Sequence, residues 1–226
     1  MTHLSRRSRP SHPHTGFTLV ELIISLTLLA MILGSVGMIA VRGMSLFRES
    51  SARNEINARA GRTIDRVKRE LLAARGSDAV ALLTTPPGAT TVWSTGLDFP
   101  TALDWQAGAV VWSSTRRITF ELAPGELDNG ADDNGNGLID EGSVVLIDNP
   151  GLASQVRAVL VSGVRRFLEG EVRGGGDENG NGLVDEPGFC FSMEDGSLHM
   201  RLTLEKNRGA DGLLARTLED SLSLRN

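Results

Sequence analysis

The chain has a single cysteine, Cys190, among its 226 residues, so an intramolecular disulfide is excluded. Cys190 stands between Phe189 and Phe191, and we expect it to be a small buried hydrophobe. The sequence also lacks the G-x-S-x-G, H-E-x-x-H and C-x-x-C motifs, and His199 is the only histidine after residue 14. No set of residues suggests catalysis, and we predict that the protein is not an enzyme.

Residues 17–226 contain fewer positive than negative charges. Those residues contain Arg6, Arg7 and Arg9 and no acid, so removing their three charges from the total of −5 leaves −8 for the remainder. An acidic chain is repelled by phosphate backbones, and nucleic acid is therefore not an expected partner.

Residues 17–41 form an apolar run of 25 residues whose only charge is Glu21. About 20 apolar residues cross a bilayer as a helix, so the run is long enough for a single membrane span. It is too long for the apolar region of a cleaved secretory signal, and no small-x-small site closes it. The preceding arginines favour a cytoplasmic N-terminus and a C-terminal domain on the other side of the inner membrane.

The residues around Glu21 are more specific than a plain anchor requires. A basic leader, residues 1–16, ends in Gly16 and is followed by Phe-Thr-Leu-Val-Glu and further apolar residues. This segment resembles the class III signal of type IV prepilins and of the pseudopilins of type II secretion systems. The resemblance implies that prepilin peptidase cleaves after Gly16 and methylates the new N-terminal residue, Phe17.

The resemblance also implies a role for Glu21 in assembly. A carboxylate in the membrane is costly, and the new amine of Phe17 in a neighbouring subunit would neutralise it. The pair would then fix the stagger between helices in a filament. The alternative is a simple anchor in which Glu21, five residues into the run, is tolerated near the interface.

The helix is expected to continue beyond the membrane half, residues 17–41, into an amphipathic half, residues 42–76. Apolar residues recur there at spacings of three and four, and the remaining positions are mostly charged. The predicted stripe consists of Ile56, Ala60, Ile64, Val67 and Leu71. Arg75 and Gly76 end the pattern as a cationic last turn and a C-terminal cap.

Residues 77–226 are predicted to form a β-rich periplasmic domain, which gives the whole chain an α+β fold. The predicted strands are 109–112, 118–122, 143–147, 156–161, 164–172, 188–193, 198–205 and 214–224. In the segment 198–205 the apolar residues alternate with polar ones, so one face is expected to be buried and His199 to face solvent.

This larger domain, the segment 160–164 and the terminal Ser-Leu-Arg-Asn resemble, more loosely, the J-type minor pseudopilin. The resemblance implies a structural subunit at or near the tip of the type II secretion pseudopilus. Its partners would be the other minor and major pseudopilins, prepilin peptidase and the inner membrane. Alternatives with the same anchor are a minor type IV pilin, a calcium-stabilised adhesin and, least favoured, a membrane-anchored calcium-dependent hydrolase.

Two acidic segments, within 128–142 and 177–187, share eight of ten residues at a distance of 45 positions. The pattern of each follows an EF-hand loop, in which oxygen ligands alternate along the chain and glycine makes the sharp turn at position six. The candidate ligands in the first loop are Asp132, Asn134, Asn136, Leu138, Asp140 and Glu141. Those in the second are Asp177, Asn179, Asn181, Leu183, Asp185 and Glu186.

Both loops depart from the EF-hand pattern at position twelve, where Ser143 and Gly188 replace the bidentate glutamate. We therefore expect calcium as a cofactor in weak sites, in the range of about 10⁻⁴–10⁻³ M that is typical of extracellular modules. The alternative is a pair of Asn-Gly turns whose acids only keep the surface soluble.

Overall fold

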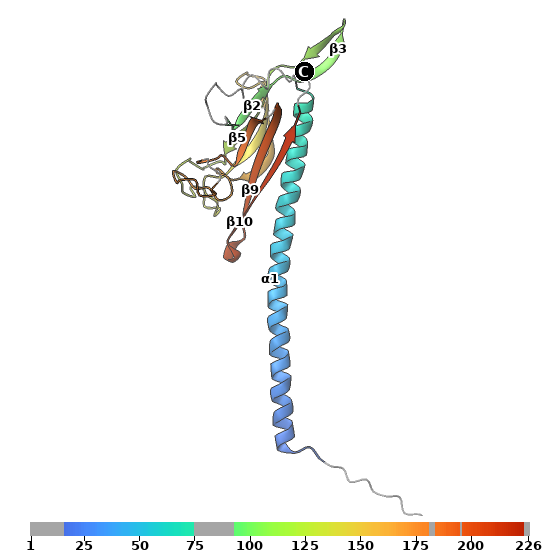
Figure 1. Cartoon of the computed structure of the whole chain (residues 1–226), viewed down its shortest axis with the longest axis vertical. Helices are drawn as coiled ribbons and strands as arrows, with labels where there is room; N and C mark the ends of the chain where they lie inside the picture. Colours follow the sequence, from blue (N-terminus) through green and yellow to red (C-terminus); the bar gives the residue numbers. More distant parts are fainter. Residues whose placement is uncertain (1–15, 75–92, 181–183, 195, 224–226) are drawn as a thin grey trace, which may run out of the picture. The chain divides into compact units, whose positions relative to one another are not determined.

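A computed structural model describes residues 16–74, 93–180, 184–194 and 196–223 (Figure 1). The contacts divide the chain into two units, residues 1–50 and 51–226. The predictions for the leader, for the Arg75–Gly76 helix end and for the last three residues lie outside the described residues, as do Asn181 and Leu183.

One helix, α1 (Leu19–Leu72), contains the whole apolar run and most of the predicted amphipathic segment. Thr18 and Glu21 form a capping box at its start, because the Glu21 N–H donates to Thr18 Oγ1 at 3.2 Å and the Thr18 N–H donates to Glu21 Oε2 at 3.0 Å. The long predicted helix is therefore confirmed, with a defined N-terminal cap.

The first unit contains the apolar part of α1, and its side chains are exposed over the whole run. By length and composition this is the one described helix that could cross a membrane. Apolar side chains surround this part of the helix on all sides, so it lacks the single apolar face with which an amphipathic helix packs on a globular domain.

In the second unit, residues 52–71 of α1 pack on the globular domain through one stripe. The buried positions of the stripe are Ala52, Ile56, Ala60, Thr63, Ile64, Val67 and Leu71. All five apolar positions predicted from the spacing are among them. Charged residues beside the stripe pair with the sheet, as Lys68 does with Asp220 at 2.8 Å and Glu55 with Lys206 at 2.6 Å.

The domain is built on an antiparallel sheet that, in the described part of the chain, has eight strands. Seven of them follow the order β1-β8-β9-β7-β6-β5-β2. The eighth, β10, lies off this path and pairs with β9. The strands are β1 (Trp93–Ser94), β2 (Gly96–Phe99), β5 (Arg116–Leu122), β6 (Gly142–Asp148), β7 (Val156–Val164), β8 (Phe189–Glu194), β9 (Ser197–Asn207) and β10 (Leu213–Leu222). A separate hairpin joins β3 (Ala102–Gln106) to β4 (Ala109–Trp112), and a short 3-10 turn, η1 (Gly209–Asp211), precedes β10.

One face of this sheet and the stripe of α1 form the core. Leu198, Met200, Leu202 and Leu204 of β9 are all buried in it, as the alternation predicts. Cys190 is 3% exposed, and its burial raises the pKa of the thiol to about 11, so it is the inert hydrophobe that was expected.

One predicted strand is wrong. The segment 164–172 is not a strand beyond Val164: the chain bends at Arg166 and turns at residues 169–170, where Gly170 has a φ of +98°. The outer face of β9 is partly covered, since His199 is half-buried, Thr203 is 0% and Glu205 6% exposed. The acidic loops lie against that face: the Asn207 side-chain amide donates to the Asn136 carbonyl at 3.2 Å.

Candidate functional site

The N-terminal site consists of Gly16, Phe17 and Glu21 at the start of α1. Phe17 is 84% exposed, and a Cβ added at Gly16 would meet no atom within 4 Å. The segment that a peptidase would have to enter is thus free of contacts with the rest of the described chain. Glu21 lies one turn into the helix, where its carboxylate accepts from both the N–H and the hydroxyl of Thr18.

The capping box is a function of Glu21 that the sequence reading overlooked, although Thr-x-x-Glu is its recognisable signal. The cap and an intermolecular pairing with an amine are compatible. A carboxylate has about four lone-pair positions, and the two bonds from Thr18 leave capacity for another donor.

The second candidate site is built by the acidic loops, which connect β5 to β6 and β7 to β8. Their described parts share backbone features as well as most of their sequence. Asp140 and Asp185 both have left-handed backbones, with φ of 50° and 52°. Asp140 accepts from the N–H of Asn129 at 2.9 Å, and Asp185 accepts from the N–H of Gly174, 45 residues after Asn129, also at 2.9 Å.

The structural repeat begins earlier than the predicted one. Glu126 lies six residues before Asp132 and accepts from the N–H of Asn134 at 2.9 Å. Glu171 lies six residues before Asp177 and accepts from the N–H of Asn179 at 3.3 Å. A glycine precedes each glutamate, so the Gly-Glu pair was a signal that extending the alignment would have found.

The structure brings some predicted ligands together and directs others elsewhere. The side-chain amides of Asn134 and Asn136 both donate to Glu141 Oε1, at 2.9 and 2.6 Å. Asp132 holds the loop closed, since it accepts from the N–H groups of residues 135–137. Leu138 is buried, and its N–H donates to Asn136 Oδ1 at 2.8 Å.

Asp140 and Asp185 bind the backbone that leads into each loop rather than a centre shared with the other predicted ligands. In the second loop, Asn179 donates to Glu186 Oε2 at 3.1 Å. Nowhere in the described ranges do three or more His, Cys, Asp or Glu side chains converge to hold a metal ion. A cation there would need amide or carbonyl oxygens as well as carboxylates.

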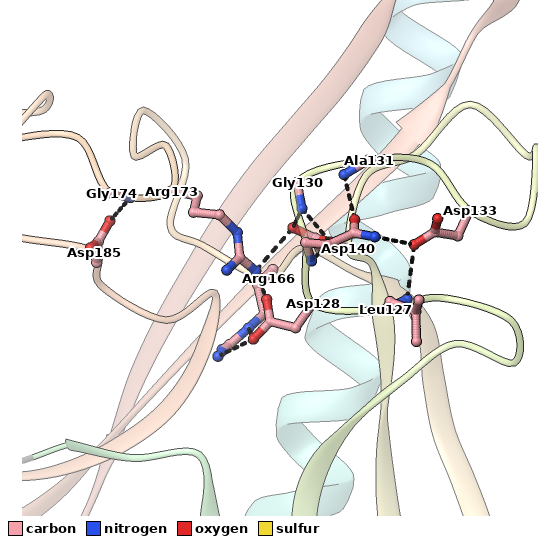
Figure 2. A network of polar contacts seen from close by, with 11 residues as sticks. Leu127, Asp128, Gly130, Ala131, Asp133, Asp140, Arg166, Arg173, Gly174 and Asp185 are labelled. Atoms are coloured by element: carbon pink, nitrogen blue, oxygen red, sulfur yellow. Dashed lines mark hydrogen bonds and ion pairs between the residues drawn. The ribbon is translucent and has the colours of Figure 1, made fainter.

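Arginines join the two loops to each other (Figure 2). Arg173 of the second loop pairs with Asp128 and Asp140 of the first, and Arg166 pairs with Asp128 at 3.2 Å. A cavity of about 450 Å³ elsewhere, lined by residues of α1 and β7, has no acidic loop residue in its lining. Between the loops lies another of about 380 Å³, whose lining includes Glu171, Glu205 and Arg165.

Glu205 on β9 is a buried carboxylate beneath the loops. Burial raises its pKa, Arg165 at 3.9 Å lowers it, and the nearby Glu141 raises it, so that the pKa is about 7. When the pH is below 4.5, the ordinary pKa of a glutamate, Glu205 is protonated in the folded and the unfolded chain alike. As the pH rises toward 7, only the unfolded chain loses the proton, so stability must fall over this interval and level off above it.

We therefore expect Glu205→Gln to raise the melting temperature at pH 8 and to leave it nearly unchanged at pH 4.5. The gain at pH 8 has an upper limit of about 3 kcal/mol, because one pKa unit corresponds to 1.36 kcal/mol. Thermal melts of the full chain in detergent with chelator measure it. Glu169→Gln, whose carboxylate pairs with Arg216 at the surface, is the control and should not alter the pH profile. An identical pH profile for Glu205→Gln and wild type would contradict the assignment.

Comparison with known proteins bears on the N-terminal site. Residues 12–37 match the family model described as the prokaryotic N-terminal methylation motif. The match is consistent with the class III signal of prepilins and pseudopilins, a class of structural, filament-forming proteins that are not generally enzymes. No curated protein and no solved structure gives a significant match to the chain.

Proposed function

We propose that this protein is a minor pseudopilin, a structural subunit of the type II secretion pseudopilus that resembles the J-type subunit. The observation that carries the proposal is the methylation motif at the start of a helix that is exposed and apolar in its first half and bound to a β-rich domain through its second half. This combination supplies a membrane anchor before assembly and a helical stalk for packing in a filament afterwards.

Its place outside the cytoplasm, its partners and its position at or near the tip belong to the same proposal. The other pseudopilins would pack against the exposed half of α1, and prepilin peptidase would process the segment at Gly16. The single cysteine is in keeping with a secretion subunit, since the resemblance to type IV pilins would lead one to expect a C-terminal disulfide pair, which one cysteine cannot form. Neighbouring genes for a secretion ATPase and further pseudopilins would separate this proposal from a type IV pilus subunit.

In this proposal Glu21 pairs with the amine of Phe17 in the adjacent subunit. Breaking a buried ion pair by removing one partner costs about 3–5 kcal/mol. Glu21→Ala should therefore reduce photo-cross-linking from Leu29, a residue 51% exposed on the same helix, to neighbouring pseudopilins by about 100-fold or more. Membrane insertion should remain, because an intramembrane charge has been removed.

Thr18→Ala is the matched control, because it removes the side-chain half of the capping box and keeps the carboxylate. If Glu21 acts only as a helix cap, the two variants should lose cross-linking to the same extent. Pairing with an amine is supported only when Glu21→Ala loses the cross-linking to neighbouring pseudopilins and a processed Thr18→Ala variant keeps it.

A further inference from the structure

The first acidic loop contains two buried carboxylates with oxygens that have no partner. Glu126 is 6% and Glu141 2% exposed, and Oε2 of each makes no hydrogen bond. Both carboxylates contact the same residue, since Asn134 donates its N–H to Glu126 and its side-chain amide to Glu141, both at 2.9 Å. Both carboxylates thus lie within hydrogen-bond distance of one residue of the loop, Asn134.

Such an arrangement is unfavourable without a cation. Two buried negative charges close together repel each other, and each unpaired oxygen has lost its hydration. Among the described residues neither carboxylate forms an ion pair, although Arg165, Arg166 and Arg173 lie in the same region. Those arginines pair with Glu205, Asp128 and Asp140 instead.

In the second loop, the equivalent buried carboxylates are compensated in other ways. Glu186, the equivalent of Glu141, pairs with Arg201 at 2.6 Å. Glu171, the equivalent of Glu126, also has a buried Oε2 without a hydrogen bond, but it lines the cavity of about 380 Å³ between the loops. That cavity is large enough for several waters, whereas neither Glu126 nor Glu141 lines it.

We infer that the first loop is a calcium site in which Glu126 and Glu141 are the two carboxylate ligands. Glu126 precedes the EF-hand-like segment in the sequence. It would serve as the carboxylate ligand that the loop lacks at position twelve. Asn134 and Asn136, whose amides now donate to Glu141, would present their oxygens to the ion after a half-turn of each amide. That turn gives up the hydrogen bonds that the two oxygens now accept from the N–H groups of Asn136 and Leu138. Carboxylates with amide oxygens form the hard, many-oxygen donor set that calcium prefers.

This inference does not depend on the proposed function, because it concerns the fold of the domain and not its assembly. The test uses the full chain purified in detergent, with calcium chloride, magnesium chloride or chelator as the probes. Calcium at about 100 times its dissociation constant should raise the melting temperature of wild type by about 5–10 °C. Magnesium should raise it much less, because that ion requires a nearly ideal octahedral site. Equilibrium dialysis should give one calcium ion per chain.

Glu126→Gln and Glu141→Gln should each abolish the calcium shift and yet melt at or above wild type in chelator. The neutral isostere removes the repulsion that calcium otherwise relieves, so the two effects have opposite signs. A variant that simply misfolds would melt lower under both conditions. Glu171→Gln is the matched control at the equivalent position, and it should keep the full shift.

Three results would overturn the inference: equal melting of wild type in calcium and chelator, an undiminished shift in Glu126→Gln, or equal loss in Glu126→Gln and Glu171→Gln. The last result would show that the response follows the total negative charge of the loops rather than one site.

Discussion

Replacing Gly16 with phenylalanine should abolish processing, so that the full-length precursor accumulates in the membrane. The physical reason lies in the fit of residue 16 to the peptidase proposed to cleave the chain, and not in the fold of the chain itself. A Cβ at Gly16 would contact nothing within 4 Å, and residues 16–18 precede the first turn of α1. The substitution therefore leaves the described fold intact, and any loss of cleavage arises where the peptidase must fit the residue before the cut.

Intact-mass spectrometry of the membrane fraction measures this result. Wild type should give a mature chain that begins at Phe17 and carries an added methyl group. Gly16→Ala is the matched control and should be processed at least in part, because its side chain is still small. A wild-type mature chain with any other first residue, or normal cleavage of Gly16→Phe, would contradict the assignment of the site.

Ile56→Asp should unfold the β-rich domain or leave it close to unfolding at room temperature. Ile56 is 0% exposed in the core between α1 and the sheet. The change removes a buried aliphatic side chain, which alone costs about 2–5 kcal/mol, and adds a charge that has no counter-ion in its apolar surroundings. Since whole domains have only about 5–15 kcal/mol of stability, most of it would be lost.

Asn57→Asp is the control for Ile56→Asp, because it adds the same charge to the same helix at the next, exposed position. It should change stability by no more than about 0.5 kcal/mol. Urea denaturation followed by tryptophan fluorescence reports on the domain, since all three tryptophans follow residue 92. Equal midpoints for the two variants would show that the second half of α1 does not contribute to the core.

The same geometry explains why a domain cut at Gly76 is a poor fragment for study. Residues 52–71 provide six buried apolar residues of the core, and removing them would expose the apolar face of the sheet. A fragment beginning at Ser51 keeps these contacts, in agreement with the division of the chain into residues 1–50 and 51–226.

The strands that sequence reasoning missed are short or exposed. The missed strands are β1, β2 and β3, and β3 is exposed along its whole length. A periodicity signal needs several alternating residues, so β1 and β2, with two and four residues, are too short to give one. The segment 164–172 is predicted as a strand, but its sheet pairing ends at Val164, and the chain bends at Arg166 before it turns at Gly170.

Sequence alone determined the features that depend on local spacing. These are the leader and methylation motif, the length of the apolar run, the stripe from Ile56 to Leu71, the inward face of β9 and the duplicated acidic loops. Each is set by which residue follows which along a helix, a strand or a turn, and that order is visible without a fold.

Only the tertiary structure decided what depends on residues that are distant in the sequence. It placed the acidic loops against the outer face of β9 and buried Glu205 there. It also paired Glu186 with Arg201, while Glu126 and Glu141 each kept one oxygen without a partner. The two loops are nearly identical in sequence, so their difference in charge compensation arises from what the sheet presents to each of them. Burial and counter-charge are properties of the packed domain, and spacing along the chain does not encode them.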